Sequence, residues 1–512
     1  MLRRRVTSTI ALAILSSAAR DVIAQQVVVS QIAQMPYIPV NYQYQNWTAV
    51  AQGFDSTVFN PVAQSTYQYP TFWFRGGTVN GISEGFAMPS YIGQTQATEG
   101  DGEAITEIGA VLGASLVGIN KQSQTLSDGN TYDFVQMASR FYDSGSTADL
   151  VLNNIGSQGT GSFWYDQTPQ IMFDGLISQY YSSYAPGSAG QQRLDTIMTT
   201  SAAKMHAVID VLAGNSTTAN PSFNYQGFNY VTMQPITGGH TEPDGAAGAA
   251  YEQYMAYIHT GNATDLSDAE RCINTLQATP VNQNPLYESV LPFGALTAAR
   301  LNAEQGTNYD VAKIVNWCFS PTSVARPGWG AISASQWGGY GAAGLIGSTT
   351  DQGGYGFSMN SYLYPAALVP LVRYDDRFAN SVGQWMLNLT NSSRMFLKSD
   401  LPAGNQTNST WNDAPSNYYS YEGVKESSNG ISPLAGGDGT GYNPAWLNFA
   451  YGSGDVGVLG SIVSPTNVSM ILQLNLLATD FFHGPADPSY LLYNPYNTQK
   501  LVQINVGSTP VN

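Results

Sequence analysis

Apolar residues recur at helical spacing from about residue 98 onward, and the helical segments come in pairs. In the first segment Ile105, Ile108, Leu112, Leu116 and Ile119 are three or four residues apart, which places them on one face of a helix. The same spacing, with the turns between segments, predicts five successive helical hairpins. Their ranges are 101–119 with 131–142, 167–181 with 191–212, 245–259 with 266–276, 287–305 with 309–318, and 354–372 returning through 389. We expect a sixth pair within 456–481.

The two ends of the chain have a different pattern. Residues 25–80 are rich in Gln, Tyr, Pro and β-branched residues, which predicts an extended segment that covers other parts of the molecule. Residues 490–506 have strand character. We therefore predict a mainly α protein, with an N-terminal extended segment at 25–97, a helical domain at 98–484 and a C-terminal β segment at 485–512.

The first 24 residues have the features of an export signal: Arg3, Arg4 and Arg5, an apolar stretch, and a small-residue cleavage site at 22–24. No later run of about 18 apolar residues predicts a membrane span. Eight Asn-x-Ser/Thr sequons are typical of a secreted glycoprotein and predict surface positions. They are at Asn46, Asn215, Asn262, Asn388, Asn391, Asn405, Asn408 and Asn467. We predict a secreted, extracellular monomer without a membrane segment.

The chain has few charged residues, and most of them are acidic. Charged residues are 11% of the total, and 19 Lys and Arg face 35 Asp and Glu, a formal net charge of −16. So few basic side chains argue against binding of nucleic acid and of uronate or sulfate polymers. The hydrophobic share of 43% and the aromatic share of 12% allow a large buried core. A neutral partner fits this composition best.

Cysteine and histidine show no metal-site spacing. Cys272 and Cys318 either form one disulfide in an oxidising compartment or remain buried thiols, and the sequence leaves both open. Neither has a zinc-site spacing, and no two histidines are four residues apart on a helix. The histidines are His206, His240, His259 and His483. We expect no metal and no cofactor.

Short acidic segments containing Gly or aromatic residues lie near the starts of four of the predicted first helices. They are 98–103 (Thr-Glu-Gly-Asp-Gly-Glu), 163–167 (Phe-Trp-Tyr-Asp-Gln), 240–245 (His-Thr-Glu-Pro-Asp-Gly) and 348–355 (Ser-Thr-Thr-Asp-Gln-Gly-Gly-Tyr). Together with the hairpins, over roughly residues 98–480, they make the chain resemble the six-hairpin glycosidase and polysaccharide lyase group. The resemblance implies an (α/α)6 toroid and action on a carbohydrate. It assigns no catalytic residue by position.

In a ring of hairpins the N-terminal ends of the inner helices meet at one face, so these acidic segments would surround one site. Glycoside hydrolysis needs one protonated carboxyl as the acid and one ionised carboxyl as base or nucleophile. Glu242 is the first candidate for the acid, because it follows a Gly-Gly-His turn and precedes an Ala-rich helix. The candidates for its partner are Asp244, Asp166 and Asp351. Each can also be a helix cap, Asp244 above all.

Further acids and aromatic residues belong to the candidate set. Glu99, Asp101 and Glu103 share the expected face, and Asp413 and Glu422 lie in later loops. Aromatic faces stack on sugar rings, and polar side chains bind sugar hydroxyls. The expected substrate-binding residues are therefore Trp73, Trp164, Tyr165, His240, Trp329, Trp337, Tyr340 and Tyr355. Most aromatic residues in a large domain belong to the core, as we expect for Trp317 and Trp385.

A dense charged group at 373–377, Arg-Tyr-Asp-Asp-Arg, lies in the turn of the fifth hairpin. In a ring of hairpins that turn is at the end opposite to the acidic segments. We therefore predict a structural ion-pair cluster there.

These observations predict a secreted glycoside hydrolase that cleaves a neutral polysaccharide or oligosaccharide with a carboxylate pair. A polysaccharide lyase is the alternative, with His240, Tyr251 or Tyr254 as the base. The low Lys and Arg content argues against its uronate substrate. A non-catalytic secreted carbohydrate-binding protein is the third hypothesis. The glycan, its linkage and the stereochemical course depend on the shape of the site and stay open.

Overall fold

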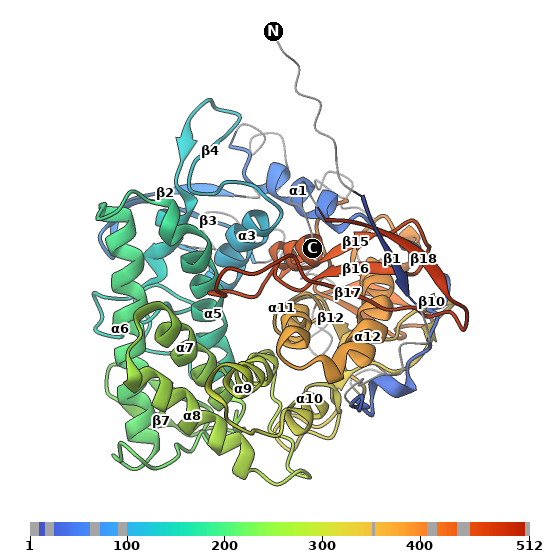
Figure 1. The fold of residues 1–512 in the computed structure, drawn as a ribbon. Coiled ribbons are helices and arrows are strands. Elements are labelled where there is room, and N and C mark those ends of the chain that lie inside the picture. Colours follow the sequence, from blue (N-terminus) through green and yellow to red (C-terminus); the bar gives the residue numbers. More distant parts are fainter. Residues whose placement is uncertain are drawn as a thin grey trace.

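The structure is a computed structural model that describes residues 10–15, 25–61, 72–90, 100–350, 354–406, 417–437 and 451–506. These residues form a mainly α fold with several small sheets, which confirms the predicted fold class at that level (Figure 1). Over the same ranges, no helix is long and apolar enough to cross a membrane.

Six helices pack side by side in a closed ring. Each contacts the next in chain order, and the last contacts the first. Figure 1 shows α5, α7, α9 and α11 around the middle of the molecule. Ring helices are buried on most sides because each has neighbours along the ring and outside it. In α11, for example, every residue except the last two, Arg373 and Tyr374, is buried. The six are α3 (Ala104–Leu116), α5 (Phe163–Tyr180), α7 (Gly245–Thr260), α9 (Leu291–Gln305), α11 (Ser358–Tyr374) and α13 (Val456–Ile462).

A second set of helices lies outside the ring, and each follows an inner helix in sequence and packs against it. The turns between them have the expected chemistry: α7 ends at Gly261, whose φ is 74°, and Asn262 caps the next helix by accepting a hydrogen bond from Thr264 N–H. Five hairpins therefore lie where the periodicity predicts them. The outer helices are α4 (Phe134–Ala138), α6 (Ala189–Leu212), α8 (Ala263–Ala278), α10 (Val311–Phe319) and α12 (Ala379–Ser392).

The sixth hairpin differs from the predicted one. Within 456–481 only α13 is an α-helix, and the chain continues into β15 (Val463–Pro465) and β16 (Leu472–Asn475). The outer position beside α13 is filled by α1 (Trp47–Val58), which comes from the segment predicted to be extended. Both predictions were wrong at this point because α1 and α13 lie at opposite ends of the chain, and local periodicity says nothing about such a pair.

Glycine lets α13 close the ring against α3. A Cβ atom at Gly113 would overlap the carbonyl oxygen of Gly454, and one at Gly457 would overlap the backbone of Gly113. The two backbones are therefore in direct contact, and a side chain at either position would push them apart.

The largest sheet is antiparallel with the strand order β14-β13-β12-β11-β8, and all of its residues are buried. Its strand β12 leads directly into α11, so the sheet covers the N-terminal end of that helix. Strands of three residues, each containing Gly or Ser, produce no readable alternation, so the sequence did not predict this sheet. The strands are β8 (Trp329–Ala331), β11 (Ile346–Ser348), β12 (Tyr355–Phe357), β13 (Gly423–Lys425) and β14 (Leu434–Gly436).

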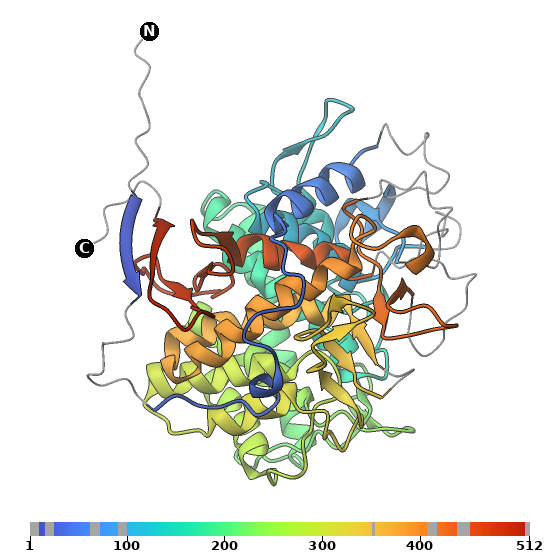
Figure 2. The same cartoon turned by 90° about the vertical axis from the view of Figure 1, so that its right-hand side faces the viewer.

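The remaining strands form hairpins and one three-stranded sheet, in which β16 lies between β15 and β17 (Tyr490–Leu492). In addition, β1 (Ile10–Leu15), within the predicted export signal, pairs antiparallel with β18 (Lys500–Asn505), as Figure 2 shows. The hairpins join β2 (Trp73–Val79) to β3 (Ile82–Ala87), β4 (Gln124–Thr125) to β5 (Thr131–Tyr132), β6 (Gly227–Asn229) to β7 (Gln234–Ile236), and β9 (Gln336–Trp337) to β10 (Tyr340–Gly341).

Residues 25–43 run along α12, and Figure 2 shows this dark blue segment crossing the orange helices. Side chains of α12 donate hydrogen bonds to its backbone carbonyls: Ser381 to Val27, Gln384 to Met35, Asn388 to Pro36 and Asn391 to Val40. Asn388 and Asn391 are therefore buried, with exposed fractions of 1% and 4%. These two sequons do not mark surface positions, which corrects the prediction for them.

Residues 476–483 cover the C-terminal ends of α9 and α11. Arg300 Nη1 donates a hydrogen bond to Phe481 O at 2.9 Å, and Tyr374 OH donates one to Asp480 Oδ2 at 2.9 Å. Arg373 also pairs with Asp480. The predicted charged group therefore forms structural ion pairs at this end, and the N-terminal ends of the inner helices are where the candidate residues meet.

Candidate functional site

Glu242 lies where the start of α7 meets the start of α5. Its Oε1 accepts a hydrogen bond from Ser162 Oγ at 2.7 Å and is 2.9 Å from His240 Nε2. Its Oε2 accepts one from Trp164 N–H at 3.0 Å. Ser162 is the N-cap residue of α5 and Trp164 lies in its first turn. The Glu242 carboxyl thus caps α5 from a neighbouring hairpin, a contact between residues about 80 positions apart.

The protonation of Glu242 depends on two opposing effects. The residue is fully buried, and burial raises its pKa from 4.5 to about 7. The hydrogen bonds from Trp164 and Ser162 and the positive charge of Arg326 act in the opposite direction, because they stabilise the ionised form. Burial is the larger effect. The carboxyl therefore keeps its proton in weakly acidic solution, as a general acid must.

Asp166 lies beside Glu242 in the first turn of α5. Both of its oxygens accept a hydrogen bond from Thr160 N–H, at 3.0 and 3.2 Å. Asp166 is buried, and burial, with a smaller effect from the negative charge of Glu242, raises its pKa to about 7. Near pH 7 each of these two neighbouring carboxyls can therefore be protonated or ionised.

Asp244 occupies the N-cap position of α7 but makes no capping hydrogen bond. Its Oδ2 instead accepts hydrogen bonds from Tyr287 N–H at 2.8 Å and Glu288 N–H at 3.3 Å, in the segment before α9. Burial, together with the charge of Glu242, holds the pKa of Asp244 well above its usual range. The structure therefore brings Glu242, Asp166 and Asp244 together. Glu242 and Asp244 each tie the start of α7 to a neighbouring hairpin, whereas Asp166 holds the loop before its own helix.

His240 connects this group to the surface. Its side chain is 33% exposed, whereas that of Glu242 is 0% exposed. The ring stacks on Tyr287, with 4.7 Å between ring centroids and 9° between planes. Arg326 lies 5.4 Å from the Tyr287 ring and pairs with Glu288. Burial and the charge of Arg326 hold the pKa of His240 below 6.5, so the imidazole is neutral near pH 7.

Further aromatic contacts continue from Arg326 around this end of the ring. The Arg326 guanidinium lies 3.6 Å from the Trp329 ring, and Trp329 packs edge-on against Phe357 at 6.2 Å. Phe357 stacks on Tyr451 at 6.4 Å, and Tyr451 stacks on Tyr165 at 6.5 Å. Trp164 packs against Tyr165 at 4.7 Å, and its backbone N–H binds Glu242, which returns the series to His240. We call these residues the rim circuit: Trp164, Tyr165, His240, Tyr287, Arg326, Trp329, Phe357 and Tyr451.

The rim circuit joins the starts of all six inner helices. Five of them contribute a member at or just before their first turn, and α3 joins through Glu103, its N-cap residue. Tyr165 OH donates a hydrogen bond to Glu103 Oε1 at 2.8 Å, and Ser90 Oγ donates one to Oε2. Glu103 is partly exposed, unlike the three buried acids. The members of the rim circuit that are partly exposed can stack on a sugar, whereas Trp329, Phe357 and Tyr451 are buried and support them. The partly exposed aromatic residues are Trp164, Tyr165, His240 and Tyr287.

Four members of the rim circuit were not among the candidates from the sequence: Tyr287, Arg326, Phe357 and Tyr451. Three of them come within five residues before an inner helix, the same position as His240 before α7. That spacing is the signal that could have identified them. Arg326 lies in a loop before β8, and no feature of its local sequence indicates the site.

The other predicted aromatic residues lie beside the rim circuit or apart from it. Tyr355 stacks on Phe357 at 6.2 Å, whereas Trp337 is buried in β9 and Tyr340 lines a separate surface hollow. Trp73 is buried in β2. Trp317 and Trp385 are core residues, as predicted.

The remaining acidic candidates have mixed positions. Asp351, Glu99 and Asp413 lie outside the described residues. Asp101 pairs with Arg75 at 3.2 Å. Glu422 is buried, and its backbone carbonyl accepts a hydrogen bond from the first residue of α11.

The two tyrosines proposed as lyase bases lie inside α7, away from the rim circuit. Tyr251 and Tyr254 are both fully buried. Tyr254 OH donates a hydrogen bond to Glu304 at the far end of α9. Of the three candidate bases, His240 is therefore the one at the rim.

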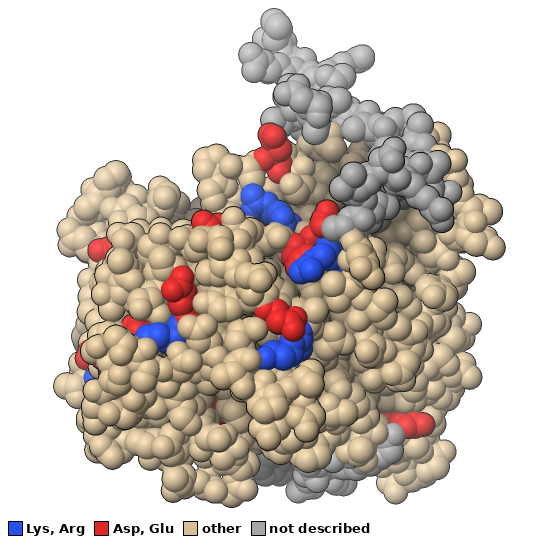
Figure 3. All heavy atoms as spheres, turned by 60° about the horizontal axis from the view of Figure 1, so that its bottom comes forward, with Lys and Arg blue, Asp and Glu red and all other residues tan. Residues whose placement is uncertain are grey.

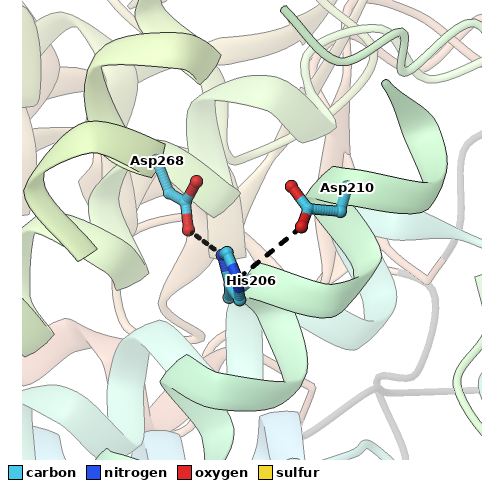
Figure 4. A group of neighbouring side chains, drawn as sticks. All are labelled: His206, Asp210 and Asp268. Atoms are coloured by element: carbon cyan, nitrogen blue, oxygen red, sulfur yellow. Dashed lines mark hydrogen bonds and ion pairs between the residues drawn. The ribbon is translucent and has the colours of Figure 1, made fainter. Parts of the chain in front are cut away.

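One group in the described part of the chain has ligand atoms close enough to hold a metal ion: His206, Asp210 and Asp268 (Figure 4). His206 Nδ1 is 2.6 Å from Asp268 Oδ2, and Nε2 is 3.6 Å from Asp210 Oδ2. Arg271 Nη1 donates to both carboxylates, at 2.8 and 2.7 Å. Because Arg271 already supplies the positive charge, the group is explained as an ion-pair cluster between α6 and α8.

The two cysteines have different locations in the outer layer. Cys272 lies in α8 and Cys318 in α10, and both are buried free thiols. Burial raises the pKa of both thiols well above the usual range. Of the two alternatives left open by the sequence, the structure has buried thiols rather than a disulfide.

Similarity to known proteins is confined to solved structures. No protein-family model matches the chain, and no curated protein matches it. Among solved structures, the chain is similar to a metagenome-derived glycoside hydrolase family 9 endoglucanase, with a TM-score of 0.41 and 10% identity over 81% of this chain and 80% of that one. A TM-score of this size assigns no function to the chain.

Proposed function

We propose that the protein is a glycoside hydrolase built on an (α/α)6 toroid, and that it cleaves a neutral polysaccharide or oligosaccharide at the rim circuit. The observation that carries the proposal is the position of Glu242: a carboxyl with a pKa of about 7, beside Asp166 and in contact with Trp164 and His240 of the rim circuit at the starts of the inner helices.

The raised pKa values support an acid and base role for this pair. Because burial raises the pKa of both Glu242 and Asp166 to about 7, each carboxyl can be protonated or ionised near neutral pH, which allows one to act as the acid and the other as the base. We assign Glu242 as the acid and Asp166 as its partner, while Asp244 supports the segment that carries Tyr287. Asp351 stays a candidate partner.

The proton reaches the substrate through His240 in this proposal, because His240 is exposed and Glu242 is not. Glu242 passes its proton to His240 Nε2 while His240 Nδ1–H protonates the glycosidic oxygen. The bond from the anomeric carbon to that oxygen breaks, and its electron pair stays on the oxygen. Water then adds to the anomeric carbon, and its proton returns to the carboxyl pair.

A neutral glycan fits the surface better than a charged one. On the face shown in Figure 3, uncharged residues dominate, and basic groups lie beside acidic ones. The formal net charge of −16 would repel a polyuronate or a sulfated glycan. Aromatic faces with few charges are the lining that a neutral sugar needs.

The proposal is tested by hydrolysis of a panel of neutral polysaccharides with the parent protein and three variants. Glu242→Gln and Asp166→Asn each remove one member of the pair, and we expect release of reducing ends to fall by roughly 10²–10⁴-fold in each. Glu84→Gln, at an exposed acid in β3, is the matched control and should keep full activity.

The other outcomes separate the alternatives. Unchanged activity in Glu242→Gln would remove Glu242 from the mechanism. Products that absorb as unsaturated uronates would identify a lyase, and binding of a glycan without any product would identify a carbohydrate-binding protein. We also propose that the chain is exported and cleaved near residue 24, which N-terminal sequencing of the secreted protein would test.

A further inference from the structure

A surface hollow of about 530 Å³ lies beside the end of α12. It is lined by Asn41, Tyr42 and Gln43 of the N-terminal segment, by Tyr340 and the glycine turn of the β9–β10 hairpin, and by Arg394. Ligand sites commonly have volumes of about 300–1,000 Å³, so the hollow is large enough for a sugar residue.

Hydrogen bonds hold the walls of the hollow in place. Asn41 Nδ2 donates to Gly339 O at 2.7 Å, which joins the N-terminal segment to the hairpin. Gln43 N–H donates to Asn391 Oδ1 at 3.1 Å, which joins the segment to α12. Gly339 has a φ of 90°, and an added Cβ would meet nothing within 4 Å, so the turn leaves open space beside its backbone.

The lining has the chemistry that recognises a neutral sugar. Tyr42 and Tyr340 are both partly exposed and provide aromatic surface. Burial, with smaller effects from Tyr44 and Tyr496, raises the pKa of Tyr42 to about 12, so its hydroxyl stays protonated and can donate. The side chain of Gln43 is exposed and has no hydrogen bond to any described residue, so its amide can bind a hydroxyl.

Arg394 at the hollow is an unusual buried cation. Its side chain is 9% exposed, and its Nε and Nη1 have no hydrogen-bond partner among the residues that the structure describes. Both atoms are also closed to solvent, so a sugar would meet only the part of the Arg394 side chain that faces the hollow. Asp400 lies 3.6 Å from Nη2 and balances the charge, which favours a neutral ligand over an anion.

The hollow lies at the same end of the molecule as the rim circuit. Because α11 and α12 form a hairpin, the C-terminal end of α12 is beside the start of α11, where Phe357 belongs to the circuit. The β9–β10 hairpin also follows β8, which carries Trp329. A long glycan bound at the circuit could therefore extend over the outside of the ring toward the hollow.

We propose that this hollow is a secondary sugar-binding site that holds a distant part of a neutral polysaccharide chain. The inference rests on the proposed function and extends it, because a second site of this kind makes a polymer, rather than a short oligosaccharide, the substrate. The site contributes to binding of the polymer and takes no part in bond cleavage.

The test measures binding by gel electrophoresis through soluble β-glucan and soluble mannan. The variants are Tyr340→Ala and Gln43→Ala, and the control is Tyr37→Ala, a 66% exposed tyrosine of the same segment outside the hollow. For the polymer that the parent binds, we expect each hollow variant to bind at least tenfold more weakly and the control to bind like the parent. The hollow variants should also raise KM for that polymer and leave kcat on a short oligosaccharide unchanged.

Three outcomes would overturn the inference: equal binding by parent and hollow variants, binding of dextran sulfate instead of the neutral polymers, or no binding by the parent. The first leaves the proposed function intact, because cleavage by the Glu242 pair is measured separately on the parent. Thermal unfolding is measured for every variant. If Tyr340→Ala does not fold, Gln43→Ala decides, since the exposed Gln43 side chain makes no hydrogen bond to any described residue.

Discussion

Replacing Glu242 by Gln is expected to change the stability of the protein in opposite directions at low and at high pH. The folded carboxyl has a pKa of about 7, against 4.5 for the ordinary side chain. The folded state therefore holds the proton more tightly than the unfolded state does. As pH rises from 4.5 to 7, the unfolded chain ionises first, and the parent loses stability over that window.

The size of the effect follows from the shift. A difference of about 2.5 pKa units corresponds to about 3 kcal/mol of unfolding free energy between pH 4.5 and pH 7 and above. Gln does not titrate, so the variant escapes this loss. The amide oxygen of the new side chain can accept from Trp164 N–H. Its amide nitrogen can donate to Ser162 Oγ, and to His240 Nε2 when that nitrogen carries no proton. The exchange itself therefore costs about 1 kcal/mol.

We therefore expect Glu242→Gln to be less stable than the parent by about 1 kcal/mol at pH 4, about equal to it at pH 5, and more stable by about 2 kcal/mol at pH 8. Urea unfolding at pH 4, 5, 6, 7 and 8 measures the difference, with Glu84→Gln as the control for a Glu-to-Gln exchange at an exposed site. A difference that stays constant with pH, or that becomes more unfavourable to the variant at pH 8, would refute the reasoning. In that case Glu242 would be an ionised helix cap and could not be the acid.

Three further predictions concern the fold and its modification. Gly113→Ala should lower the free energy of unfolding by about 3 kcal/mol or more, because the added Cβ would overlap the Gly454 carbonyl. A thermal midpoint equal to that of the parent would show that α3 and α13 are not in contact. In a host that attaches N-glycans, Asn215 should carry one, because it is exposed in a loop, and peptide mapping after enzymatic deglycosylation would detect it. The same mapping should find Asn388 unmodified, since it is buried under the N-terminal segment, and a glycan there would mean that α12 is not packed as described.

Five of the six hairpins could be read from the sequence because their signals are local. The turn at 260–262 is an example, since Gly261 adopts a φ of 74° and Asn262 caps the following helix, and both residues are the usual choices for those positions. The spacing of apolar residues within one helix can be recognised without knowing which helix packs against it. The sixth pair could not be read in this way, because α1 and α13 meet only after the ring has closed.

The candidate site was predictable in part for the same reason. Glu242, Asp166 and His240 were selected because each lies at or near the start of an inner helix, and the structure places the three together. Their burial could not be predicted, since it depends on segments that arrive from other hairpins. Arg326 was missed because its contacts with Tyr287 and Trp329 join parts of the chain whose proximity no local pattern records.

By itself, then, the amino-acid sequence determined the helical hairpins, their turns and which of their ends carries the acidic and aromatic residues, because these follow from spacing and turn chemistry over a few residues. Only the tertiary structure decided that α1 completes the outer layer, that Glu242 caps a neighbouring helix, and that the N-terminal segment forms one wall of the hollow at Arg394. The physical reason is that burial, hydrogen-bond partners and pKa values are properties of contacts between segments distant in sequence, and these exist only in the closed ring.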